Sequence, residues 1–274
     1  MKHGSVDWRE RLGQIASRAL VATGVVAIFL PLVLTVYLSV FDETLISFPP
    51  RGYTLHWYAG IIPTFGSALR TSLVTALLAT VISLGVGVPA AIGLTRDRFR
   101  GRGAVSTLLL APLTIPGVAI GLGIFVLAVL VEERTELALG GTSGLLVAAH
   151  VLITLPWVVR LCLAALANND RAAEEAAASL GATPLRVIWR VTLPAMRGGI
   201  VAGALFAFIV SFENLEMTLF LTAPGMTTLP ISILSYLQYH IDPLVAAVAV
   251  AQVVLVGGTL LLLDRYVPVA RALA

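Results

Sequence analysis

The sequence predicts an all-α membrane protein with six transmembrane helices. Of the 274 residues, 58% are hydrophobic and 12% are charged, whereas soluble domains carry about 25% charged residues. Six apolar runs reach the length of roughly 20 residues that a helix needs to cross a bilayer. Because lipid offers the backbone no hydrogen-bond partners, one helical domain over 19–266 is expected. The runs lie at 19–41, 67–94, 104–131, 142–165, 198–222 and 244–266.

The first two runs are flanked by charged and aromatic segments. Residues 1–18 are charged and are expected to form a cytoplasmic segment with a short interfacial helix. Between the two runs, Pro49-Pro50 and Gly52 disfavour a continuous helix. Trp57-Tyr58 then fits an aromatic anchor at the membrane surface.

Glycine and proline are frequent in the second and third runs. Small residues let helices approach closely, and proline kinks or breaks a helix. This composition suits a pore that moves, and it also suits ordinary packing between membrane helices. The residues concerned are Gly85, Gly87, Pro89, Pro112, Pro116, Gly117, Gly121 and Gly123.

The basic residues predict the orientation of the chain. Fourteen of the 18 lie in the N-terminal segment, the turn 96–102, the loop 166–197 and the C-terminal end, and only Arg51, Arg70 and Arg134 lie in the opposite set of connections. Cytoplasmic segments of membrane proteins are enriched in Lys and Arg. Both termini, including the tail 267–274, are therefore expected on the cytoplasmic side, which agrees with an even number of spans.

Several functional classes find little support in the sequence. The single cysteine, Cys162, excludes an intramolecular disulfide, and no His/Cys spacing suggests a metal site. No glycine-rich phosphate loop ends in Lys-Ser/Thr, and no set of catalytic side chains is evident. Arg residues occur in short runs between apolar spans, which disfavours nucleic acid as a partner. A membrane enzyme is the least favoured class.

A polar segment separates the fourth and fifth runs. Its start, Asn168-Asn169-Asp170, offers N-capping groups, and Glu174 and Glu175 suit the first turns of a helix. Gly181 fits a helix end that needs positive φ, and Pro184 fits the first turn of a second helix. Residues 168–194 are therefore predicted to form a cytoplasmic helix-turn-helix.

The spacing of Glu175-Ala176-Ala177, Gly181 and Val191-Thr192-Leu193-Pro194 resembles the "EAA" loop in the membrane subunits of type I binding-protein-dependent ABC importers. The family often has Ile where this chain has Val191. In that family the loop docks into a groove on a separate ATPase. The resemblance assigns ATPase coupling to Glu174, Glu175, Ala176, Ala177, Gly181, Leu185, Trp189, Leu193 and Pro194.

The same resemblance implies a set of partners. Two copies of an ATP-binding subunit would carry ATP and Mg, so that this chain needs no cofactor of its own. A second permease subunit, expected to be a different paralogous chain although an identical one stays open, would complete the pore. A periplasmic solute-binding protein would deliver a small-molecule solute to this multi-pass protein of the bacterial inner membrane, which also contacts membrane lipid.

Further segments resemble the spermidine/putrescine permease branch of the family and imply a polyamine solute. They are Tyr53–Tyr58, Ala111–Gly117, Ala149–Leu152, Ser211–Asn214 and Leu219–Pro230. The branch usually carries an acidic pair where this chain has Glu213 and Asn214. Other solutes of the family stay open: aminoethylphosphonate, ferric ion, an opine or an amino-acid derivative. An ATP-independent channel or secondary transporter, or a structural assembly protein, is a less favoured alternative.

The transport path is expected to include Ser211, Glu213, Asn214 and Glu216. A carboxylate in hydrocarbon costs roughly 2.5 kcal/mol or more, so it usually faces a pore or a partner. Glu213 and Glu216 are three positions apart and are expected to share a helix face. They either line the pore, where they would attract an amine, or form structural hydrogen bonds with a partner subunit or with His150.

Overall fold

The computed structural model describes residues 8–43, 48–97, 99–167 and 169–266, with the side chains of 8–12 and 262–266 left aside. These residues form helices joined by turns, with isolated β-bridges at Phe41–Tyr53 and Ala223–Met226. They divide into two compact units. Unit 1 comprises the described residues up to Thr64 together with His240–Val254, and unit 2 comprises the described residues of Phe65–Tyr239 together with those from Leu255 onward. The predicted tail 267–274 and residues 1–7 lie outside the described residues.

Unit 1 begins with α1 (Trp8–Leu38), a single helix of 31 residues. It passes residues 18 and 19 without a break, so the expectation of a separate short helix before the first span is wrong for the described residues. The chain then turns back on itself, and Thr54 N donates to Val40 O at 2.8 Å. Trp57 Nε1 donates to Phe41 O at 2.6 Å, which fixes the indole of the predicted aromatic anchor.

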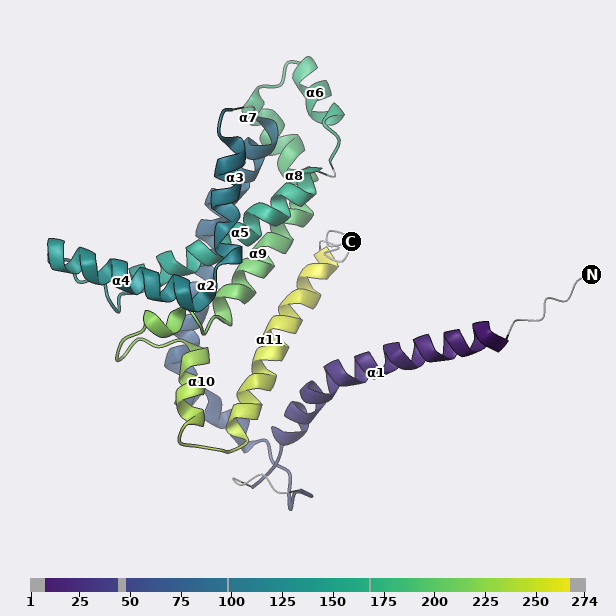
Figure 1. Ribbon diagram of the computed structural model, residues 1–274, viewed down its shortest axis with the longest axis vertical. Helices are drawn as coiled ribbons and strands as arrows, with labels where there is room; N and C mark the ends of the chain where they lie inside the picture. The colour runs from purple at the N-terminus through teal and green to yellow at the C-terminus, as the bar shows by residue number, and fades with distance from the viewer. Residues whose placement is uncertain (1–7, 44–47, 98, 168, 267–274) are drawn as a thin grey trace, which may run out of the picture. The chain divides into compact units, whose positions relative to one another are not determined.

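Unit 2 is built on α2 (His56–Arg96) from Phe65 onward, α5 (Ser143–Ala167) and α9 (Arg197–Phe212), and α5 and α9 run side by side (Figure 1). A Cβ atom on Gly199 would lie 2.5 Å from Ala165 Cβ and 2.8 Å from Leu161 O. Glycine therefore allows the backbones of α9 and α5 to touch, as small residues do in membrane helix pairs. The buried core of this unit includes Val88, Ala91, Val158, Cys162, Leu166, Met196 and Ala207.

The third apolar run, expected as one span over 104–131, is a bent pair of helices rather than one straight helix. α3 (Arg102–Leu110) and the 3-10 turn η1 (Ala111–Thr114) are followed by α4 (Gly117–Thr135), bent by 106°. Ile115 has extended backbone, φ −98° and ψ 132°, because a residue before proline avoids the helical region. Hydropathy alone detects the apolar length and cannot detect this corner.

The fifth run also differs from the prediction. α9 ends at Phe212 rather than at residue 222. At its start it follows the segment Pro184–Ala195 with a bend of 70°. Within the described residues, four helices are long and apolar enough to cross a membrane: Gly13–Leu38, His56–Arg96, Ser143–Ala167 and Leu244–Leu261. Six spans result if each bent pair counts as one.

Short elements complete the chain. Figure 1 shows α6 and α7 at one end of unit 2 and α10 at the other. Leu229 N, at the start of α10, donates to Ser72 Oγ on α2 at 2.8 Å, which anchors that end. The elements are α6 (Ala172–Ser179), α7 (Pro184–Val187), the π-helical turn η2 (Ile188–Thr192), α8 (Leu193–Ala195), η3 (Thr218–Phe220), α10 (Leu229–Leu237) and α11 (Leu244–Tyr266).

Candidate functional site

The polar segment forms the predicted helix-turn-helix. α6 ends at Ser179 and is followed by Leu180 and Gly181, whose φ is +83°. Ala182 N donates to Ala177 O at 3.1 Å, and Gly181 N donates to Ala178 O at 2.9 Å. This pair of hydrogen bonds is the Schellman ending that a left-handed glycine permits. Pro184 occupies the first turn of α7, where its missing N–H costs nothing.

The predicted capping at the start of this segment is partly observed. Asp170 Oδ1 accepts a hydrogen bond from Ala172 N at 3.0 Å, which satisfies one free amide of α6. Asn168 lies outside the described residues. On the other side of the turn, α7 continues through η2 and α8 toward α9. The helix-turn-helix is thus covalently continuous with a core helix of unit 2.

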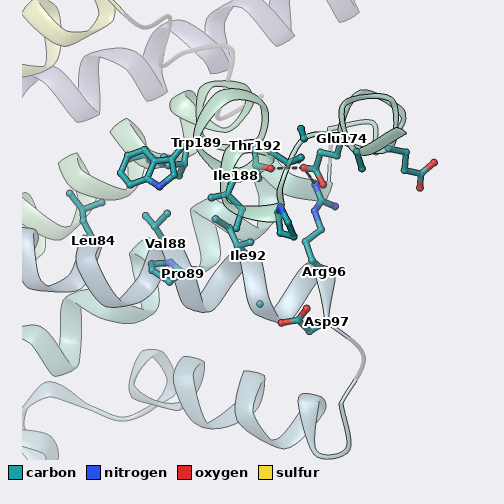
Figure 2. Close-up of a pocket in the computed structure, with 18 of the residues that line it drawn as sticks. Leu84, Val88, Pro89, Ile92, Arg96, Asp97, Glu174, Ile188, Trp189 and Thr192 are labelled. Atoms are coloured by element: carbon teal, nitrogen blue, oxygen red, sulfur yellow. Dashed lines mark hydrogen bonds and ion pairs between the residues drawn. The ribbon is translucent and has the colours of Figure 1, made fainter. Parts of the chain in front are cut away.

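A cavity of about 980 Å³ lies between the last turns of α2 and the helix-turn-helix. Figure 2 shows Trp189 toward one end of this cavity and Glu174 with Arg96 at the other. Its walls are mainly apolar. They include Leu84, Val88, Pro89, Ile92, Val187, Ile188, Leu193 and Ile200.

One carboxylate oxygen closes the polar end of the cavity. Glu174 Oε1 lies 2.7 Å from Arg96 Nη2 and accepts a hydrogen bond from Thr192 Oγ1 at 2.9 Å (Figure 2). The side chains of Arg96 and Glu174 are only 16% and 18% exposed, and Thr192 is buried. We call Arg96, Glu174 and Thr192 the Glu174 clasp. It joins the end of α2, the helix α6 and the turn η2.

The sequence-predicted coupling residues divide into inward and outward groups. Glu174 points to α2, and Ala177 and Leu193 are half-buried. The exposed side chains include two large apolar ones, Leu185 at 65% and Trp189 at 66% exposure, and the turn adds Leu180 at 89%. Trp189 also lines the open end of the cavity. Apolar side chains exposed together often mark a protein interface. The other exposed members of the predicted set are Glu175, Ala176, Gly181 and Pro194.

The predicted transport-path residues lie at the other end of α9. Glu213 caps the C-terminus of that helix, and the chain turns before η3 begins at Thr218. The expectation that Glu213 and Glu216 share a helix face is therefore wrong, since the helix stops at Phe212. Both glutamates are exposed. A Cβ on Gly117, the first residue of α4, would lie 2.8 Å from Glu216 Oε2, so the Glu216 carboxylate rests beside the start of that helix.

His150 organises the polar groups around this turn. Its Nδ1 lies 2.7 Å from Ser211 Oγ and its Nε2 lies 3.0 Å from Thr218 Oγ1. Thr218 Oγ1 in turn donates to Asn214 Oδ1 at 2.9 Å. The alternative in which His150 bonds to a glutamate is thus not observed, because both ring nitrogens contact hydroxyl groups. Ser211 is buried within this network rather than exposed on a pore surface.

Sequence reasoning missed Arg96 and Thr192 as partners of the helix-turn-helix. Arg96 counted only as part of the basic turn 96–102, and Glu174 lies 78 positions further along the chain. No local spacing connects them. Arg171, whose guanidinium donates to Thr95 O, also lies against the end of α2.

Comparisons with known proteins identify relatives in transport. The family model described as the binding-protein-dependent transport system inner membrane component matches residues 83–268. The putrescine transport permease PotI of Escherichia coli is 34% identical over 205 residues, 72% of either chain. PotC, a spermidine/putrescine permease of Haemophilus influenzae, is 29% identical over 83% of this chain and 87% of its own. The molybdenum permease ModB of Mycobacterium bovis is 33% identical over 76% of this chain and 81% of its own.

Solved structures confirm the fold. A bacterial ABC transporter that imports alginate matches with a TM-score of 0.72 at 16% identity, over 97% of this chain and 99% of that one. The MetNI methionine ABC transporter matches with a TM-score of 0.56 at 19% identity, over 83% and 99%. The predicted all-α permease fold and the function of a transmembrane permease subunit, rather than an enzyme, are confirmed. The chain belongs to the family of inner membrane components of binding-protein-dependent transport systems.

Proposed function

We propose that this chain forms half of the translocation pathway of an ATP-driven importer for a polyamine. A second permease, favoured here as a different paralogous chain, supplies the other half. Two copies of an ATPase bind the helix-turn-helix segments from the cytoplasm and carry the ATP and Mg. A periplasmic binding protein delivers the solute. Both termini lie on the cytoplasmic side, as the distribution of Lys and Arg favours.

The observation that carries this proposal is the outward surface of the helix-turn-helix. Leu180, Leu185 and Trp189 are exposed on a segment that basic residues assign to the aqueous cytoplasm. A protein groove that covers them removes their apolar surface from water, at roughly 25 cal/mol per Å². Glu175 adds an exposed carboxylate beside them. These groups form the surface to which the ATPase binds.

In the proposed cycle, ATP draws the two ATPases together and their movement carries the two helix-turn-helix segments with it. The permease helices then rock, and the pathway opens toward the docked binding protein. Hydrolysis returns the pathway to its inward-open form. The segment Pro184–Ala195 meets α9 at a bend of 70°. This movement is transmitted to α9, a core helix, at that bend.

The polyamine assignment rests on relatives and on charge. PotI is 34% identical to this chain and ModB is 33% identical. Sequence identity alone therefore does not decide whether this chain shares the solute of PotI or that of ModB. Glu213 and Glu216 are exposed at the end of α9. Carboxylates concentrate cations and repel anions, which favours an amine such as putrescine over an anionic solute.

Reconstitution of the assembled transporter in liposomes tests the coupling. We expect uptake to require ATP, and Gly181→Val to abolish it because a β-branched residue is strained at a φ of +83°. Gly181→Asn is the matched control, since asparagine tolerates positive φ and nothing lies within 4 Å of the Gly181 Cβ position. Uptake without ATP, or unchanged uptake in Gly181→Val, would establish a channel or secondary transporter instead.

The same liposomes test the solute. Binding protein loaded with putrescine or spermidine should stimulate ATP hydrolysis, and binding protein mixed with an anionic solute should not. Stimulation by the anionic solute alone would overturn the polyamine assignment and leave the importer class intact.

A further inference from the structure

The Glu174 clasp connects α2 directly to the helix-turn-helix, to which α2 has no direct covalent connection. Residue 174 follows α2 by 78 positions, and the covalent path from α6 leads through α7, η2 and α8 into α9. Only side-chain contacts can therefore hold α6 to α2. The salt bridge from Arg96 Nη2 to Glu174 Oε1, at 2.7 Å, is the shortest charged contact between them.

We infer that the Glu174 clasp is a mechanical link that makes the cytoplasmic end of α2 move as one body with α6 during transport. The inference rests on the proposed coupling function and assigns Glu174 and Arg96 a positioning role rather than contact with the ATPase. Movement of the helix-turn-helix is then transmitted to the membrane helices by two routes. One is the covalent route into α9, and the other is the clasp into α2.

Burial supports a permanent contact rather than a casual surface pair. Exposed ion pairs contribute little because water and salt screen them, whereas the two side chains here are 16% and 18% exposed. Breaking a buried pair leaves one charge without compensation. The adjacent residue shows the contrast, since Glu175 is exposed.

The shared acceptor strengthens the link. Glu174 Oε1 also receives the hydrogen bond from Thr192 Oγ1 at 2.9 Å, so the carboxylate fixes α6 to η2 as well as to α2. Arg171 donates to Thr95 O, one residue before Arg96. Two arginine contacts, one from Arg96 at the end of α2 and one from Arg171 just before α6, thus resist separation of α6 from the end of α2.

The cavity beside the clasp explains why such a link is needed. About 980 Å³ of space separates the apolar face of α2 from η2 and α8. Packing over this stretch is partial, because Leu193 of α8 packs against the buried cluster that holds Val88 and Ala91 of α2 while the cavity leaves space beside it. The clasp therefore adds to the contact that packing makes between the two segments. The clasp closes the gap at its polar end, where Figure 2 shows Arg96 directed from α2 to Glu174.

The coupling ratio, solute imported per ATP hydrolysed, tests the link in the assembled transporter. Removing a coupling free energy of the usual size should lower the ratio about fivefold or more in Glu174→Gln and in Arg96→Gln. Exchange of the two charges, Arg96→Glu with Glu174→Arg, should recover most of the loss. Arg100→Gln is the control, because it removes a charge from the same turn without touching the clasp.

Pulsed electron resonance distances test it independently of activity. Spin labels at Val86 on α2 and Ser179 on α6, both exposed, in a Cys162→Ala background, should keep one distance with and without ATP. The same labels with Glu174→Gln should give a distance that changes with ATP.

Each outcome has a defined meaning. A wild-type distance that changes with ATP, unchanged coupling ratios in the single variants, or an exchanged pair as poor as the singles would overturn the clasp as a link. A wild-type transporter that shows no ATP-dependent uptake would overturn the proposed function instead, so the two failures are distinguishable.

Discussion

His150 on α5 lies 2.7 Å from Ser211 on α9, although the two residues are 61 positions apart. Which of the two groups donates the hydrogen follows from the neighbouring hydrogen bonds. Thr218 Oγ1 gives its proton to Asn214 Oδ1, so it must accept from His150 Nε2–H. Neutral His150 then carries no proton on Nδ1, and Ser211 donates to that nitrogen. The imidazole therefore joins α5, α9 and the turn that carries Glu213 and Glu216.

Loss of this imidazole should destabilise the protein. His150 is 1% exposed, and Ser211 is 3% exposed. In His150→Phe the Ser211 hydroxyl loses this partner in a buried place, which costs about 1–3 kcal/mol. We expect a lower unfolding temperature of the purified protein in detergent. His56→Gln is the control because the His56 side chain is 55% exposed, and its unfolding temperature should stay near that of the wild type. Equal unfolding temperatures for His150→Phe and the wild type would contradict the network.

Gly121 should tolerate no larger residue. A Cβ there would lie 2.6 Å from Met217 O and 2.9 Å from Met217 Cα, and backbone atoms cannot move aside cheaply. Gly121→Ala should therefore destabilise the protein by about 1–3 kcal/mol. Gly123→Ala, on the same helix, meets nothing within 4 Å and should be neutral or slightly stabilising, since alanine favours helix over glycine. Differential scanning fluorimetry compares the two variants. Similar melting temperatures would show that α4 does not press on this segment.

Ser72 should control local opening at the start of α10. The first amides of a helix have no partner inside it, and Leu229 N finds Ser72 Oγ at 2.8 Å. Ser72→Ala removes that acceptor, so the Leu229 amide should exchange hydrogen about fivefold faster or more, as loss of one buried hydrogen bond of about 1 kcal/mol implies. Ser67→Ala, an exposed position on the same helix, is the control. Hydrogen–deuterium exchange of the peptide containing Leu229 measures the effect, and equal rates in both variants would exclude the anchor.

The sequence predicted those features that depend on local composition. The apolar runs gave the positions of the long helices, and Gly181 with Pro184 gave the turn between α6 and α7 because both residues have restricted backbone roles. The helix-turn-helix was therefore correct in outline. The resemblance to importer permeases added the family, which the comparisons confirmed.

The features that depend on contacts across the chain were not predictable from one sequence. The corner of 106° before α4 leaves the hydropathy of the run unchanged, even though Pro116 offered a local hint. Glu213 and Glu216 were placed on one helix because the run stays apolar to residue 222, whereas the chain leaves the helix at Phe212. The contact of Arg96 with Glu174 spans 78 positions, and nothing near either residue indicates the other.

Charge at the end of α9 should set the apparent affinity for a cationic solute. Glu213 and Glu216 are both exposed. A carboxylate that attracts an amine through solvent contributes up to about 1 kcal/mol to the binding free energy, which is about fivefold in affinity. Glu213→Gln and Glu216→Gln should therefore each raise the KM for uptake of putrescine by about two- to fivefold at low salt. Glu133→Gln, an exposed acid beyond the end of the apolar part of α4, should leave KM unchanged.

Asn214→Asp extends the same measurement in the opposite direction. The new carboxylate keeps the acceptor that receives Thr218 N at 3.2 Å and Thr218 Oγ1 at 2.9 Å, so the turn should hold its shape while one negative charge is added. KM should fall, and the fall should shrink as salt rises, because ions screen exposed charges beyond about 10 Å at 0.1 M. If KM is the same in Glu213→Gln, Glu216→Gln and Asn214→Asp, the solute does not respond to charge at this turn, and the Glu216 carboxylate serves the contact with Gly117 at the start of α4 instead.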